Sequence, residues 1–182
     1  MRRDLVQRAM AHDQEAFTEL ARLSIDKLYA IARLILHSPE AAEDAVQETL
    51  TSAWRDIAAL RDPDRFEVWL RRLLVHACYR ESRRERSRLR TMARVLLIDP
   101  VAPDATADIA MRDQLEPAFA RLSPDQRALI VLHYYLDLPL AETADTLGLP
   151  IETTKTRLRR TTQAMRATLD ADARTSRMGA AT

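Results

Sequence analysis

Residues 140–160 read Leu-Ala-Glu-Thr-Ala-Asp-Thr-Leu-Gly-Leu-Pro-Ile-Glu-Thr-Thr-Lys-Thr-Arg-Leu-Arg-Arg, and this stretch decides how the C-terminal part of the chain folds. It predicts a short helix, a tight turn at Gly148, and a second helix that begins with basic and hydroxyl side chains. The small residue Ala144 stands where two helices would cross closely. The pattern is typical of a helix-turn-helix, whose second helix can lie in the major groove of DNA.

The second helix of this motif carries polar side chains that suit contacts to base edges and phosphates. The candidates for these contacts are Thr153, Lys155, Thr156, Arg157, Arg159 and Arg160. A second interpretation stays open, in which a helical hairpin only exposes a basic face to solvent. The turn at Gly148 and the apolar helix expected before the motif favour DNA binding.

The composition of the chain indicates an all-helical fold. Its 182 residues contain only 2 glycines and 5% aromatic residues, and they suffice for one ordinary domain or two small ones. The net charge of +1 decides little, but all of the 28 basic residues except Lys27 and Lys155 are arginine. Arginine suits phosphate and base recognition, although a GC-rich genome produces the same bias without a functional cause.

The sequence offers no support for catalysis or for a cofactor. Cys78 is the only cysteine, which excludes an internal disulfide and a cysteine-based zinc site. The histidines lie on separate elements, and no Gly-rich phosphate loop, nucleophile elbow or paired-carboxylate site is visible. No apolar run approaches the roughly 20 residues of a membrane span, and the first residues lack a signal-peptide core. We therefore expect a cytoplasmic protein that is not an enzyme, holds no metal and needs no cofactor.

Hydrophobic periodicity predicts a bundle of three helices in residues 1–90. Ser38 and Pro39 mark the start of the second helix, as N-cap and first helical residue. The third helix is expected over residues 65–88, after a break at residues 61–64. The first helix is expected over residues 13–36, with an apolar stripe at Phe17, Leu20, Ala21, Ile25, Leu28, Ala32 and Ile35.

The character of the chain changes after this bundle. Residues 91–113 contain two prolines, several alanines and acidic side chains, and we expect a flexible linker there. Its apolar patch at residues 95–98 could form a short helical turn or a docking spot. A second small domain is expected over residues 114–172, where Ser123, Pro124 and Gln126 form a capping-box signal. Residues 173–182 show no periodic pattern, and we expect a disordered tail.

Two charged surfaces of the first domain are candidate binding surfaces. The second helix has an acidic face, which is either a solubilising surface or a contact for a partner other than DNA: Glu40, Glu43, Asp44, Gln47 and Glu48. The third helix is rich in arginine, and only Glu81 and Glu85 can pair with its end at helical spacing. The excess positive charge would attract a phosphate backbone, and it comes from Arg71, Arg72, Arg80, Arg83, Arg84, Arg86, Arg88 and Arg90.

These segments together resemble a known family. Residues 42–50, Ala-Glu-Asp-Ala-Val-Gln-Glu-Thr-Leu, with Ala-Trp-Arg at 53–55, are similar to region 2 of bacterial extracytoplasmic-function (group IV) sigma factors. So are residues 66–70, Phe-Glu-Val-Trp-Leu, with the arginines after them. Residues 122–160, from Leu-Ser-Pro to the end of the helix-turn-helix, resemble region 4 of the same family. The resemblance covers residues 13–169 in the expected order.

The resemblance implies a protein that binds core RNA polymerase and directs it to promoters. The acidic face would dock on the β′ clamp through Glu43, Asp44, Gln47 and Glu48, and region 4 would meet the β flap. Region 4 would read the double-stranded −35 element through the six side chains of the second motif helix given above. The loop at residues 58–64 and the third helix would open the −10 element and hold its single strand, through Arg61, Asp62, Arg71, Arg72, His76, Arg80, Arg83 and Arg84. An anti-sigma factor is the implied regulator.

The sequence departs from the family pattern at several places. His76 stands where many members have Asn, beside the −10 strand. Glu152 and Thr154 replace a usual Gly and an aliphatic residue at the start of the recognition helix, and Thr161 and Thr162 replace Ala and Arg. These changes imply an unusual −35 sequence or a weaker dependence on it.

Two other functions remain alternatives on the sequence alone. A stand-alone helix-turn-helix regulator would bind duplex DNA without polymerase and would not need the acidic face. A helical interaction or adaptor protein would leave the basic helix merely solvated.

Overall fold

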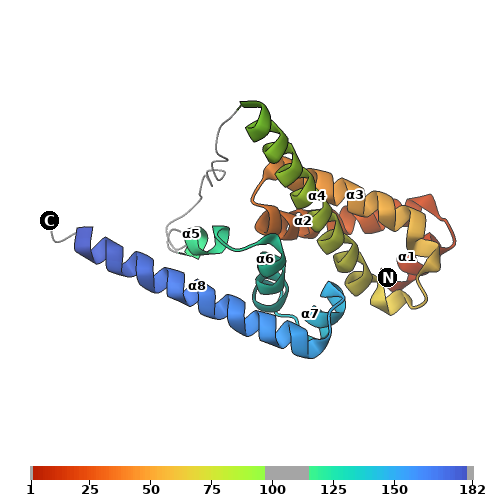
Figure 1. Cartoon of the computed structure of the whole chain (residues 1–182). Coiled ribbons are helices and arrows are strands. Elements are labelled where there is room, and N and C mark those ends of the chain that lie inside the picture. Colours follow the sequence, from red (N-terminus) through yellow and green to blue (C-terminus); the bar gives the residue numbers. More distant parts are fainter. Residues whose placement is uncertain (1, 97–114, 180–182) are drawn as a thin grey trace.

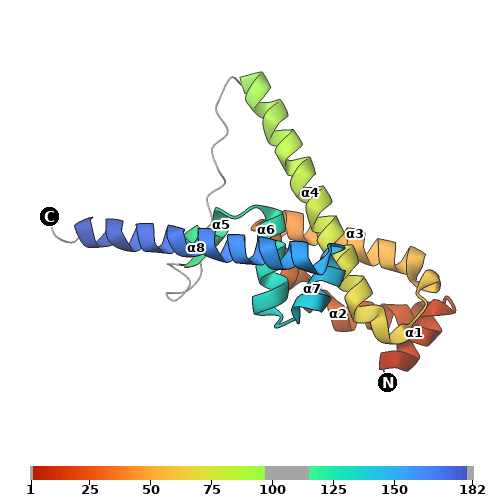
Figure 2. The same cartoon turned by 60° about the horizontal axis from the view of Figure 1, so that its bottom comes forward.

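The computed structural model of the chain describes residues 2–96 and 115–179. Every regular element in these ranges is helical, which confirms the all-helical prediction. Figures 1 and 2 show a central body from which the far ends of α4 and α8 extend in different directions. The elements are α1 (Arg2–Met10), α2 (Gln14–Leu36), α3 (Pro39–Asp56), the 3-10 turns η1 (Ile57–Ala59) and η2 (Pro63–Arg65), α4 (Phe66–Leu96), α5 (Leu115–Ala120), α6 (Pro124–Ile130), the π-helical turn η3 (Val131–Tyr135), α7 (Leu140–Leu147) and α8 (Ile151–Gly179).

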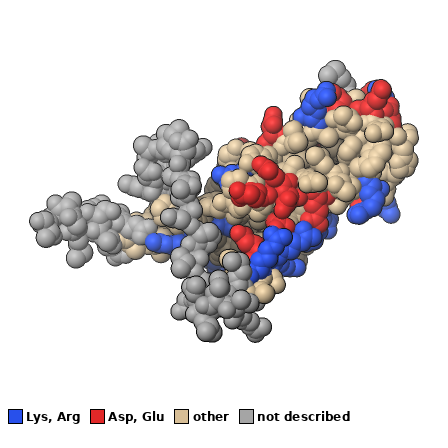
Figure 3. All heavy atoms as spheres, turned by 90° about the horizontal axis from the view of Figure 1, so that it is seen from above, with Lys and Arg blue, Asp and Glu red and all other residues tan. Residues whose placement is uncertain are grey.

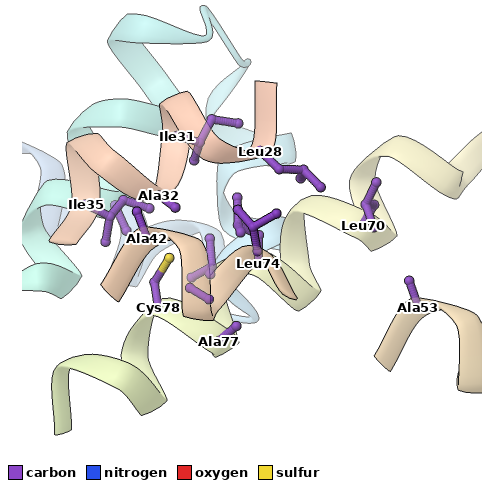
Figure 4. Packing of buried hydrophobic residues seen from close by; sticks show 14 of the residues in the cluster. Leu28, Ile31, Ala32, Ile35, Ala42, Ala53, Leu70, Leu74, Ala77 and Cys78 are labelled. Atoms are coloured by element: carbon purple, nitrogen blue, oxygen red, sulfur yellow. The ribbon is translucent and has the colours of Figure 1, made fainter. Parts of the chain in front are cut away.

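The first unit consists of α1 to α4, and α2, α3 and α4 start within one residue of where the sequence predicts. Ser38 caps α3, because its Oγ accepts a hydrogen bond from the N–H of Ala41 at 3.2 Å. Asp13 caps α2 in the same way. Figure 4 shows Ile35 of α2, Ala42 of α3 and Cys78 of α4 directed into one interior, where each of these side chains is fully buried.

The short helix α1 is an element that the sequence analysis missed. It packs against α2, η1 and η2, and it buries Val6 and Ala9. Arg3 of α1 also donates to Asp64 of η2 at 2.7 Å. A helix of 9 residues with two buried positions gives too weak a periodic signal to be read from the sequence.

The second unit consists of α5 to α8, and its local signals also hold. The N–H of Ser123 donates to Gln126 Oε1 at 2.9 Å, and the N–H of Gln126 donates to Ser123 Oγ at 3.3 Å, which completes the predicted capping box. Gly148 ends α7 in the left-handed conformation, with φ of 66°, a backbone conformation that glycine adopts without a Cβ clash.

The two units pack against each other. α6 contacts both α2 and α4, and α7 contacts α4; Figures 1 and 2 both show these helices side by side. Leu129 and Leu132 of the second unit belong to the same buried cluster as Leu28 and Leu74 of the first. The described residues therefore share one continuous hydrophobic core.

Two helices run further than the sequence analysis predicted. α4 continues to Leu96, past the predicted domain end at residue 90, so that the start of the predicted linker is helical. Val95 and Leu96, part of the apolar patch, lie in its last turn, and residues 97–113 of that linker fall outside the described residues. α8 continues to Gly179, so residues 173–179 of the predicted tail are helical rather than disordered. Neither segment contains a proline or an internal glycine, so nothing interrupts the backbone hydrogen bonds of the helix. The prediction ended both helices earlier because it relied on an apolar stripe, which these segments lack.

His37 gives the fold a pH dependence. It stacks on Phe119 of the second unit, with ring centroids 5.5 Å apart, and burial next to Arg127 and Arg33 lowers its pKa to about 4. The folded state thus favours the neutral ring, so the stability that this ring contributes is complete above pH 6.5 and is lost as the pH falls toward 4.

We expect the urea midpoint of the wild type to fall more steeply over this range than that of His37→Gln. Parallel curves would contradict the assignment.

Candidate nucleic-acid interface

The helix-turn-helix is built around the turn at Gly148. The N–H of Leu149 donates to the carbonyl of Ala144 at 3.0 Å, which closes the end of α7 and sets the direction of α8. Thr154 is fully buried at the start of α8, and its hydroxyl donates to the carbonyl of Pro150 at 3.1 Å. Thr154 therefore fills the inner position of the recognition helix without leaving its polar group unpaired.

The recognition helix α8 divides the predicted DNA-binding residues between two sides. Thr153 is half-buried and the other candidates are exposed. Arg157 is exposed but lies, by helical spacing, on the side of α8 that carries the buried Thr154 and Thr161. The side opposite the buried Thr154 carries Glu152, Lys155, Thr156, Arg159 and Arg160, because these positions recur at three- and four-residue steps.

A basic column follows one side of α4. Arg72, His76, Arg80 and Arg83 are exposed, and their spacing places them along one side of the helix. Burial, together with the charges of Arg72 and Arg80, lowers the pKa of His76, so the ring favours its neutral form. Most of the predicted −10 residues of this helix are thus brought together.

The loop before α4 adds two of the predicted −10 residues. Arg61 and Asp62 are both exposed at the entry to η2. Asp62 has a structural role as well, because its Oδ1 accepts a hydrogen bond from the N–H of Asp64 at 3.0 Å.

Arg71 does not belong to the basic column. It is buried, with a side-chain exposure of 9%, and forms an ion pair with Glu142 of α7. In this arrangement of the two units Glu142 of α7 holds Arg71, so the predicted contact of Arg71 to a DNA backbone stays a prediction. The sequence held no signal for this contact, because the two residues lie 71 positions apart.

The acidic face of α3 is also divided by its contacts. Glu43, Asp44 and Gln47 are exposed. Glu48 is instead half-buried, and it accepts hydrogen bonds from Arg80 at 2.8 Å and from Arg84 at 3.3 Å. Figure 3 shows acidic and basic side chains gathered next to each other on one face of the molecule. Glu48 therefore holds α3 to the basic helix α4, and only the first three candidates are free for a partner.

Two family descriptions match the chain: Sigma-70 region 2 over residues 20–88 and Sigma-70, region 4 over residues 112–165. The ECF RNA polymerase sigma factor SigM of Mycobacterium tuberculosis is 32% identical over 157 residues, which cover 86% of this chain and 79% of SigM. The chain belongs to the ECF RNA polymerase sigma factors. It is therefore an alternative sigma factor that directs transcription initiation.

Other members of the family agree with this assignment. SigW of Bacillus subtilis is 27% identical to this sigma factor over 166 residues, which cover 85% of this chain and 89% of SigW. The structure of CnrH in complex with the cytosolic domain of CnrY matches with a TM-score of 0.66 at 27% identity, and covers 94% of this chain and 98% of CnrH. RpoE of Bartonella quintana, solved with the anti-sigma factor NepR, has the same fold, with a TM-score of 0.67.

The region 2 part of this sigma factor has a groove that the sequence analysis missed. It runs between α2 and α3, where Ile25, Tyr29, Val46 and Leu50 give it an apolar floor beside Glu43. Ile25 was expected in the buried stripe of α2, but it is 43% exposed, because no other described helix covers this side of α2. The groove continues the free acidic face of α3.

The described part of this sigma factor shows neither a metal site nor a membrane span. Within residues 2–96 and 115–179, no three His, Cys, Asp or Glu side chains are grouped so that they could hold a metal ion. The helices of these ranges are also too short or too polar to cross a bilayer.

Proposed function

We propose that this sigma factor binds core RNA polymerase through α3 and reads a promoter through two separate basic faces, on α4 and on α8. The observation that carries the proposal is the separation of charge in one chain: a free acidic face on α3, and exposed cations on two helices from different units. A regulator that only binds duplex DNA has no use for the acidic face. The protein would act in the cytoplasm without catalysis of its own.

The polymerase-binding surface consists of Glu43, Asp44 and Gln47 with the adjoining groove. Apolar side chains in the groove offer area to bury, and the carboxylates at its edge favour a basic partner. The β′ clamp is the proposed partner of this surface, and the β flap is the proposed partner of region 4.

The −10 element is assigned to the basic column of α4 and to Arg61 and Asp62. A column of cations suits the backbone of a single strand, and His76 in its middle can accept a hydrogen bond from a base or donate one to it.

The −35 element is assigned to the outer face of α8. There Glu152 would repel a nearby phosphate and so narrow the set of DNA sequences that the helix accepts.

An anti-sigma factor is the proposed regulator. CnrH, which this chain resembles over 94% of its length, was solved with the cytosolic domain of CnrY bound. A protein of that kind could cover the acidic face and groove of region 2 and exclude the polymerase.

Transcription in vitro tests the proposed function. Purified chain is added to core RNA polymerase and a library of genomic promoter fragments, and transcripts are sequenced. We expect promoter-specific transcripts that depend on the chain. The absence of such transcripts, with tight duplex binding by the chain alone, would support a stand-alone regulator instead.

Arg160 tests the −35 assignment. Replacing Arg160 by Ala should weaken binding to promoters with the preferred −35 base by about 1–3 kcal/mol, because an arginine contact to a base edge is lost. Transcription from these promoters should fall accordingly. Arg166→Ala, at an exposed position six residues further along α8, is the matched control and should have little effect. An equal loss on all promoter sequences would show that Arg160 contacts a phosphate and not a base.

A further inference from the structure

Three basic side chains gather where α6 packs against α2. Arg33 and His37 lie one turn apart at the end of α2, because the N–H of His37 donates to the carbonyl of Arg33 at 2.9 Å. Arg127 comes from α6. The charges of Arg127 and Arg33 both act on the ring of His37 and, with burial, lower its pKa. The two guanidinium groups therefore lie within electrostatic reach of the same ring.

The two arginines of this cluster lack the partners that buried arginines usually have. Arg127 is only 9% exposed, and its Nε is buried without a hydrogen-bond partner, as is Arg33 Nη1. Within residues 2–96 and 115–179 neither side chain forms an ion pair. Arg71, which is similarly buried, is paired with Glu142. An unpaired buried guanidinium costs free energy, so Arg33 and Arg127 offer donors to a ligand of opposite charge.

The acidic side chains around the cluster do not balance its charge. Glu85 of α4 acts on Arg127, but the neighbouring Arg86 opposes it, and burial with the charge of Arg86 lowers the pKa of Arg127 to about 10. Glu40, whose pKa the charge of Arg33 helps to lower, is exposed to solvent. The cluster thus keeps an excess of positive charge.

We propose that Arg33, His37 and Arg127 form a binding site for a phosphate group. The planar fork of an arginine matches the oxygens of a phosphate, and two such forks approach from different helices. Phe119 of α5 stacks on the ring of His37, which leaves the nitrogen-bearing edge of the ring for the ligand. Arg33 and His37 are half-buried and give access from solvent, whereas the burial of Arg127 favours a small ligand over a DNA duplex.

The source of the phosphate group is either free inorganic phosphate or a nucleotide. None of the residues that the proposed function assigns to the polymerase or to the promoter belongs to this site. A ligand held by α2 and α6 together would stabilise the packing between them, because it would neutralise charges that the folded chain buries without partners.

Urea unfolding of the full chain, followed by circular dichroism, tests the site. The concentration of inorganic phosphate is varied at neutral pH, and sodium chloride keeps the ionic strength constant. A ligand that binds only the folded state raises the unfolding midpoint with the logarithm of its concentration. We expect this rise for the wild type. The matched control Lys27→Met removes an exposed cation of α2 and should keep the rise.

Two variants remove the proposed donors. Arg127→Met keeps a long apolar side chain without the buried charge, so in chloride alone it should be at least as stable as the wild type, and phosphate should not stabilise it. Arg33→Gln, at a half-buried position, should also lose the response, and it covers the case in which Arg127→Met fails to fold. An equal response of the wild type and both variants would be the general effect of phosphate on folded proteins and would overturn the site.

The ring of His37 gives a readout that does not depend on stability. Its NMR signal is assigned by its absence in His37→Gln, and its pKa is measured with and without phosphate. A phosphate beside the ring should raise the pKa from about 4 toward 6.5, and the rise should be absent in Arg33→Gln. A pKa of His37 that phosphate leaves unchanged in the wild type would overturn the site.

The same titrations with a nucleoside 5′-diphosphate identify the source of the phosphate group. Stabilisation at a lower concentration than inorganic phosphate requires would support a nucleotide, and the reverse would support the free anion. No response to either ligand would overturn the proposal. These measurements need neither polymerase nor promoter, so their failure leaves the proposed function untouched.

Discussion

A chain that carries Glu43→Arg and Asp44→Arg is expected to lose its binding to core RNA polymerase while it keeps its helical content. Both side chains are exposed on α3, and within the described residues neither forms an ion pair, so their reversal should cost the fold little. At the interface each carboxylate would be replaced by a like charge facing the basic partner. We expect binding to weaken by about 3 kcal/mol or more, which is at least about a hundredfold.

The choice of residues follows from the contacts of α3. Glu48 is left intact, because its reversal would break the hydrogen bonds from Arg80 and Arg84 and disturb the basic helix as well. The matched control is Glu15→Arg, Glu19→Arg, which reverses two acids on the N-terminal half of α2. Binding is measured by native gel shift of the core enzyme, and circular dichroism checks the fold. Equal affinity of the variant and the wild type would remove the polymerase contact from α3.

Leu74→Ala is expected to have the largest effect on stability. Leu74 is fully buried in α4, and Figure 4 shows it in the interior between α2 and α4. Truncation removes its apolar contacts and leaves a cavity that the packed helices fill only in part. The free energy of unfolding should fall by about 2–5 kcal/mol, out of a total of about 5–15 kcal/mol for an ordinary domain.

Urea unfolding followed by circular dichroism measures this change. Leu89→Ala is the control on the same helix, because Leu89 is 39% exposed, and it should change stability by less than about 0.5 kcal/mol. If the two variants lose the same stability, α4 does not form the centre of the shared core.

The residues on the exposed side of each helix of the candidate site could be predicted from the sequence, but the contacts between helices could not. Lys155, Arg159 and Arg160 lie on an exposed side of a helix, as predicted, because helical spacing alone decides which residues share a side. Helical spacing does not reveal that Arg71, which carries the same charge as Arg72, is buried against α7. Two neighbouring arginines look alike in a sequence, and only the helix packed beside them separates their roles.

The ends of the helices show the same division. Starts at Ser38 and Ser123 and the stop at Gly148 were read correctly, since each depends on hydrogen bonds within a few residues. The extensions of α4 to Leu96 and of α8 to Gly179 were missed, because they lack both an apolar stripe and a breaker.

The sequence by itself determined the helical class, the two units and the family, through local signals: caps, one left-handed glycine and apolar spacing. Only the tertiary structure decided that the two units pack on each other, that Glu142 and Asp145 of α7 pair with Arg71 and Arg65, and that Glu48 accepts hydrogen bonds from Arg80 and Arg84. The physical reason is range. Capping and periodicity act over one or two helical turns. The two ion pairs of α7, by contrast, join residues that are separated by 71 and 80 positions in the sequence, and their contact depends on how the whole core packs.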